Sequence, residues 1–96
     1  MTVTLQDLEP YRTIGPFDRA TLPAGLLKEH RLKPGAWGQL EVLSGALRFV
    51  WDLPESGALD LVAGDEMLIP SETPHHLEIA DDFSLRITFL RRREPT

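Results

Sequence analysis

Cysteine is absent from this 96-residue chain, which excludes disulfide bonds, thiolate nucleophiles, zinc–thiolate sites and iron–sulfur clusters. Histidine is scarce and occurs only as His30, His75 and His76. Any metal binding or acid–base chemistry near neutral pH must therefore depend on these three imidazoles or on carboxylates. Serine does not replace the missing thiol, because no serine stands in a G-x-S-x-G nucleophile elbow.

The chain also lacks an excess of positive charge and any long apolar run. Its 10 lysines and arginines against 15 aspartates and glutamates give a net charge of −5, whereas a general nucleic-acid binder presents a basic face to phosphate. No stretch approaches the ~18 consecutive apolar residues of a transmembrane helix. Residues 1–7 lack the basic start and apolar run of a signal peptide. We therefore expect no nucleic-acid partner, no membrane segment and a cytoplasmic location.

Length and helix-breaking residues predict one small all-β domain. A chain of 96 residues can bury one core but cannot build two lobes around a cleft, so a pocket must lie inside the fold or between copies. Eight prolines and seven glycines leave only short, strand-sized pieces. Apolar–polar alternation predicts strands at residues 26–32, 38–43, 46–51, 58–62, 67–69, 75–79 and 83–90. It turns Leu47, Phe49, Leu85 and Ile87 inward, as in an antiparallel sandwich or barrel.

We divide the chain into an irregular N-terminal arm, residues 1–24, a barrel, residues 25–90, and a charged tail, residues 91–96. Prolines interrupt the arm, so we expect at most one turn of helix there, packed on the barrel or on a dimer partner. The second and third predicted strands should form a hairpin closed by Ser44–Gly45, with the inward-facing parity changing at the turn.

Two segments resemble the motifs of the cupin family. Residues 40–49 have the form of the first cupin motif, whose core reads like V-L-x-G-x-L. Gly64, Pro70 and His75 resemble the second motif in their spacing. This resemblance implies an all-β, single-domain jelly-roll barrel of the cupin type, made of short antiparallel strands.

A closer resemblance is to the small cupin-like family related to tellurite-resistance proteins, which includes the YeaR type and the N-terminal domain of some TehB proteins. It covers about residues 16–90 and rests on the order of the pieces 23–27, His30, 35–38, 42–45 and 70–75. The resemblance implies a fold and a site in the barrel mouth. In longer TehB-type proteins a similar domain precedes a methyltransferase, but this sequence has no glycine-rich nucleotide loop, so methyl transfer is not carried over.

His30 and His75 face inward by alternation, and the cupin resemblance brings their strands together at the barrel mouth. Two imidazoles in an apolar pocket can begin a site for divalent Zn, Fe, Mn or Ni, and we predict ring nitrogens within about 6 Å of each other. The alternative is two hydrogen-bonded structural histidines. The family motif normally adds a second histidine and a glutamate, where Leu32 and Gly38 stand here. The remaining ligands would have to come from water, a substrate or another residue.

Four further side chains could contribute to the site, and each also has an alternative role. Glu72, which replaces a motif glycine, and Glu78 could supply a ligand or orient an imidazole, or both could be solvated. His76 follows His75 in a strand and should therefore point to the surface or an interface. Trp37 either lines the pocket or packs in the core or an interface.

These observations favour a module that binds a divalent metal ion or a small ligand between His30 and His75. The family resemblance links such a module to metalloid or oxyanion stress. The alternative is a small metal-dependent enzyme, of dioxygenase or isomerase type, that uses the same pocket. The incomplete ligand set favours binding over catalysis. Small size and the family resemblance together imply a homodimer.

Overall fold

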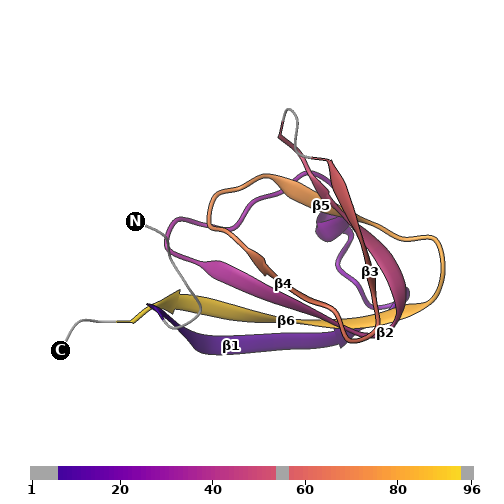
Figure 1. The fold of residues 1–96 in the computed structure, drawn as a ribbon, viewed down its shortest axis with the longest axis horizontal. Coiled ribbons are helices and arrows are strands. Elements are labelled where there is room, and N and C mark those ends of the chain that lie inside the picture. Colours follow the sequence, from indigo (N-terminus) through magenta and orange to yellow (C-terminus); the bar gives the residue numbers. More distant parts are fainter. Residues whose placement is uncertain (1–6, 54–56, 94–96) are drawn as a thin grey trace.

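The computed structural model describes residues 7–53 and 57–93 (Figure 1). These residues form six antiparallel strands and one short 3-10 helix: β1 (Leu8–Phe17), η2 (Ala24–Leu27), β2 (Trp37–Trp51), β3 (Ala58–Val62), β4 (Glu66–Ile69), β5 (His75–Glu78) and β6 (Phe83–Arg92). The expectation of an all-β antiparallel domain is therefore confirmed.

Strand β2 connects the two halves of the fold because it is long enough to belong to two sheets. Its first half pairs with β4 on one edge and β6 on the other, and β6 also pairs with β1. Its second half pairs with β3 and β5. In Figure 1, β1 and β6 run side by side along one side of the molecule, and β3 and β5 lie on the other side.

The predicted hairpin at Ser44–Gly45 is wrong, because β2 continues through this point as one strand of 15 residues. A register shift between Val42 and Ser44 marks a bulge against β6, and Gly45 follows with a φ of +73°. A Cβ at Gly45 would lie 2.1 Å from the Asp82 carbonyl oxygen, so only glycine fits here. The bulge explains the change of inward parity that the alternation indicated.

The core fills the space between the two sheets. It consists of large apolar side chains at 6% exposure or less: Leu40, Val42, Leu47, Phe49, Leu61, Ile69, Leu77, Phe83, Leu85 and Ile87. Half-buried side chains from β1, η2 and the loop before β2 pack around its margin. Burial of this apolar surface is the main stabilising contribution to the fold.

The N-terminal segment differs from the predicted irregular arm, because residues 8–17 form β1 along β6. The structure describes no neighbouring strand on the other edge of β1 within residues 7–53 and 57–93. An edge strand tolerates proline, which cannot donate a ladder hydrogen bond. The register shifts accordingly fall between Pro10 and Arg12 and between Ile14 and Phe17, next to the two prolines.

The predicted strand at residues 26–32 is also wrong. Residues 24–27 form η2, and His30 alone makes a bridge, which pairs it with His75. Pro23 precedes the helical turn and its carbonyl accepts from the Leu26 amide, so the chain is already coiled where the strand was expected. At the other end of the chain, β6 extends to Arg92, two residues into the predicted tail.

Candidate functional site

His30 and His75 meet although 44 residues separate them along the chain. The His30 amide donates to the His75 carbonyl at 3.0 Å, and the His75 amide donates to the His30 carbonyl at 2.9 Å. The two rings lie edge to face, with centroids 4.2 Å apart and an interplanar angle of 63°. The structure therefore brings together the two residues that the sequence analysis selected.

Each ring is held by the carbonyl two residues before it. The Nδ1 atom of His30 lies 2.9 Å from the Lys28 carbonyl oxygen, and that of His75 lies 2.7 Å from the Thr73 carbonyl oxygen. A carbonyl oxygen only accepts hydrogen bonds, so Nδ1 carries the proton in both rings. Each Nε2 is then a lone-pair donor for a metal ion or an acceptor for a hydrogen bond.

His75 is deeply buried, at 2% exposure, on an aromatic platform. Its ring stacks on Phe49 with a centroid distance of 5.1 Å and an angle of 18°, and Trp51 approaches edge-on at 6.5 Å. Burial lowers the pKa of His75, and the neighbouring His30 lowers it further. His75 is therefore neutral at physiological pH, which is the form that binds metals.

The pair lines a very small cavity of about 10 Å³. Six apolar side chains complete its wall, among them Leu26 of η2 and Phe49 of β2. This space is about that of one water molecule. Among the described residues that are not exposed, every side-chain nitrogen or oxygen atom buried from solvent has a hydrogen-bond partner. The Nε2 atoms of the two histidines have no such partner among these residues, so both must retain some accessible surface.

A third protein ligand does not join the pair within the part of the chain that the structure describes. No group of three or more histidine, aspartate or glutamate side chains there could hold one ion. Glu72 occupies an exposed turn at a φ of +60°, and Glu78 instead contacts His76. The predicted supplementary carboxylates therefore form no such group with the two histidines.

His76 points away from His75 and takes part in a separate polar cluster. Its Nδ1 lies 2.7 and 2.9 Å from the two carboxylate oxygens of Asp52, and its Nε2 lies 3.3 Å from Oε2 of Glu78. The hydrogen bond to Asp52, with a smaller contribution from Glu78, raises the pKa of His76. The sequence analysis missed Asp52, because its proximity to His76 depends on the register between β2 and β5.

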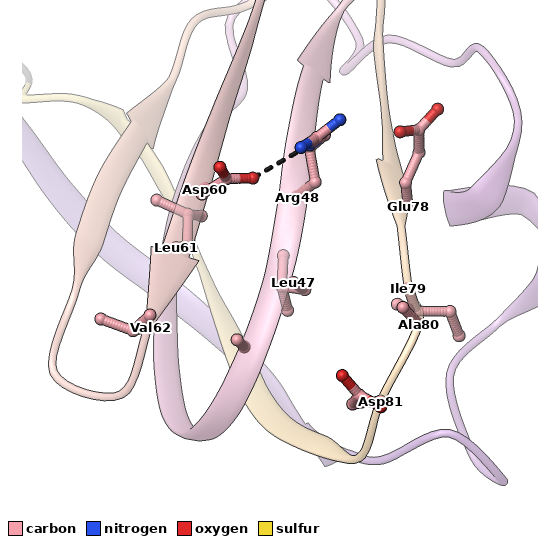
Figure 2. Close-up of a pocket in the computed structure, with 10 residues that line it drawn as sticks. Leu47, Arg48, Asp60, Leu61, Val62, Glu78, Ile79, Ala80 and Asp81 are labelled. Atoms are coloured by element: carbon pink, nitrogen blue, oxygen red, sulfur yellow. Dashed lines mark hydrogen bonds and ion pairs between the residues drawn. The ribbon is translucent and has the colours of Figure 1, made fainter.

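A larger hollow of about 470 Å³ lies against β2, β3, the end of β5 and the chain that follows it (Figure 2). Arg48 stands between Asp60 and Glu78, and its Nε donates to Asp60 at 2.9 Å. This ion pair raises the pKa of Arg48, and Glu78 adds to the effect. The cation of this hollow is thus already neutralised, and neither His30 nor His75 lines it.

Two other features bear on the expectations from sequence. Trp37 begins β2, opposite Leu90, is half-buried and does not line the histidine cavity. No helix among the described residues is long and apolar enough to cross a membrane.

Comparisons with known proteins place the domain among cupin-like folds. A sequence profile of the TehB-like domain matches residues 12–87. The crystal structure of a protein from Escherichia coli superposes with a TM-score of 0.83 at 25% identity, covering 98% of this chain and 100% of that chain. TehB from Haemophilus influenzae gives a TM-score of 0.80 at 24% identity and covers 93% of this chain, which spans only 33% of TehB.

A more distant likeness confirms the expected fold class. The crystal structure of a cupin protein from Bacteroides fragilis has a TM-score of 0.55 at 18% identity, covering 72% of this chain and 56% of that chain. The all-β domain therefore has a cupin-like fold. A search of curated proteins finds no match to the sequence.

Proposed function

The chain belongs to the TehB-like family, a tellurite-resistance-related group with a cupin-like fold, and we propose that it binds one divalent metal ion between His30 and His75. The observation that carries this proposal is the matched pair of hydrogen bonds from Nδ1 to the Lys28 and Thr73 carbonyls. Histidines that ligate metals almost always donate their other ring N–H to a carbonyl or carboxylate, which fixes the tautomer and the ring orientation.

The size of the cavity supports an ion rather than an organic molecule. About 10 Å³ between the rings and the apolar wall admits one water-sized particle, whereas sites for organic ligands run to hundreds of Å³. The neutral state of His75 supports the same conclusion, because a protonated imidazole cannot ligate.

Two nitrogen ligands leave coordination positions open. Because the cavity admits only one water-sized particle, water or a small anion would have to reach the ion from the accessible side of the two Nε2 atoms. Imidazole suits Zn, Ni and Fe(II), and we retain Mn as a fourth candidate ion. A bound ion would act as a Lewis acid on whatever occupies the open positions. Family membership supports a role in metalloid or oxyanion stress, with the ion as the point of capture. The cavity has no room for an organic substrate beside the rings, so we propose binding without turnover rather than a dioxygenase or isomerase.

Metal titration of matched histidine variants tests the proposal. Untagged protein is titrated with Zn²⁺, Ni²⁺ and Mn²⁺ by calorimetry and with Fe²⁺ under anaerobic conditions, and bound metal is counted by elemental analysis. We expect one ion per chain in the wild type. His30→Gln and His75→Gln should each weaken binding by about tenfold or more, since each removes a direct ligand.

His76→Gln is the matched control, because it removes an imidazole from the neighbouring position that faces away from the pair. It should leave the affinity unchanged. Circular dichroism verifies the fold of each variant, and His30→Gln matters most because His30 is less buried than His75. Wild-type affinity in the folded His30→Gln variant would overturn the proposal, as would loss of binding in His76→Gln alone.

A further inference from the structure

A second hollow, of about 340 Å³, lies on another part of the surface and has basic and aromatic walls. Three cations line it, Arg12, Arg31 and Lys33, together with the rings of Tyr11 and Phe89. Leu32 and Ala36 complete the wall, and no acidic side chain is among its lining residues. We call this site the basic hollow. Its volume falls within the range of small-molecule pockets.

The positive charge of the basic hollow is not neutralised by neighbouring carboxylates. Within the described residues, neither Arg12 nor Lys33 forms an ion pair. Arg31 approaches Glu29 only at 3.9 Å, and both side chains are more than half exposed, so this contact contributes little. In the hollow of Figure 2, by contrast, Arg48 is paired. The basic hollow therefore concentrates two unpaired cations, Arg12 and Lys33, and one weakly paired cation, Arg31, in a chain of net charge −5.

The rings of Tyr11 and Phe89 add aromatic surface beside the cations. Tyr11 and Phe89 lie on neighbouring strands, with centroids 6.4 Å apart and a tilt of 31° between them. Tyr11 is 41% exposed, so part of its ring faces solvent. The Arg91 guanidinium lies 5.6 Å from the Tyr11 centroid, but its Nε donates to Glu9 at 3.3 Å, so this cation is already paired. Exposed aromatic rings of this kind stack on the planar rings of ligands.

The loop that carries Arg31 and Lys33 is anchored to the turn before β5. The Ser71 hydroxyl donates to the Lys33 carbonyl at 3.0 Å and accepts from the Gly35 amide at 3.1 Å. The Glu72 amide donates to the Leu32 carbonyl at 3.0 Å. On the other wall, the pairing of Arg12 with Phe89 ties β1 to β6. Both walls are therefore held in place by hydrogen bonds, which reduces the entropy lost on binding.

We propose that the basic hollow binds a phosphate monoester carried by a planar aromatic ring. Arginine forks bind phosphate oxygens in pairs and lysine adds a point charge, so the three cations match a dianionic phosphate better than a carboxylate. The rings of Tyr11 and Phe89 provide the surface for the aromatic part of the ligand. A phosphate ion alone would leave this surface uncovered.

Phenyl phosphate is the test ligand, titrated at low salt by calorimetry and by amide chemical shifts. We expect saturable 1:1 binding, with shifts at residues 11–12, 31–33 and 89, and an affinity that falls as salt is added. Inorganic phosphate lacks the ring and benzoate lacks the second negative charge, so both should bind about tenfold or more weakly. Equal affinity for either compound would overturn the proposal, as would the absence of saturable shifts up to about 10 mM phenyl phosphate.

Charge-matched variants separate a local site from a general charge effect. Arg12→Gln combined with Lys33→Gln should weaken phenyl phosphate binding by about tenfold or more. Lys28→Gln combined with Arg92→Gln removes the same charge from exposed positions that do not line the hollow, and should stay within about twofold of the wild type. Equal loss in both double variants would overturn the proposal. His30→Gln should bind phenyl phosphate normally, so this inference stands or falls independently of the metal site.

Discussion

His30 and His75 exchange both of their backbone amide–carbonyl hydrogen bonds, at 3.0 and 2.9 Å, so the backbone itself holds their rings at a centroid distance of 4.2 Å. The rings are then aimed by two equivalent contacts from Nδ1 to the carbonyl two residues earlier. A site assembled in this way needs little rearrangement to take up an ion, and this preorganisation favours binding.

Metal binding at the histidine pair should weaken in acid. Protons compete with the ion for Nε2, so the affinity should fall once the pH drops below the usual histidine pKa of about 6.5. Because burial lowers the pKa of His75, protons compete with the ion for that ring only at a pH below this usual value. Calorimetric titration with Zn²⁺ between about pH 5.5 and 8 measures the effect. An affinity independent of pH across this range would contradict ligation by imidazole.

Replacement of Asp52 by Asn should cost stability in acid but not in alkali. Asp52 raises the pKa of His76 above its unfolded value of about 6.5. The stabilisation of the fold by this pair is therefore fully present below that pH, and it disappears as the pH rises through the folded pKa. Both side chains are about one-fifth exposed, at 20% and 19%, so we expect a loss of no more than about 1 kcal/mol.

Urea denaturation at about pH 5.5 and 8.5 measures this difference. In a background of His76→Gln the substitution of Asp52 should have no pH-dependent effect, which a double-mutant cycle shows directly. Glu78 also faces His76 and should retain a smaller part of the stabilisation. The same loss at both pH values would contradict an electrostatic contribution.

Replacement of Gly45 by Ala should disrupt the bend of β2. The new Cβ would lie 2.1 Å from the Asp82 carbonyl oxygen, in addition to the strain of a φ of +73°. Gly57 has nearly the same φ, +74°, but a Cβ there would meet no neighbouring atom within 4 Å, so Gly57→Ala carries the backbone strain alone, about 1–2 kcal/mol. We expect Gly45→Ala to cost at least about 2 kcal/mol more. Thermal denaturation of the two variants tests this, and equal costs would show that the bend tolerates a side chain.

Replacement of Leu85 by Ala should open a cavity in the core. Leu85 lies at 0% exposure between the sheets, so we expect a loss of about 2–5 kcal/mol in the free energy of unfolding. Leu43, at 42% exposure on β2, is the control, and Leu43→Ala should change stability by no more than about 0.5 kcal/mol. Chemical denaturation compares the two. A cost at Leu43 equal to that at Leu85 would mean that Leu43 is covered in solution, for example by a second copy.

The sequence predicted the inward faces better than the boundaries of the strands. Alternation correctly turned Leu47 and Phe49 of β2 inward and correctly separated His75 from His76. It failed over residues 8–17, because prolines argue against a strand unless the strand lies at an edge, and edge position depends on distant partners. It also failed over residues 26–32, where the same alternation coincides with a helical turn and a single bridge.

The sequence by itself determined the chemical inventory and the local pattern of the chain. The absence of cysteine and the presence of only three histidines restricted the side chains that could bind a metal ion. The apolar–polar alternation determined which side chains face the core, because pleating is a property of each strand alone. The tertiary structure decided that β2 runs unbroken through Gly45 and that His30 meets His75. It also decided that the carboxylate of Asp52 lies within hydrogen-bond distance of His76. These relations depend on hydrogen-bond register between segments far apart in the chain, which no local pattern specifies.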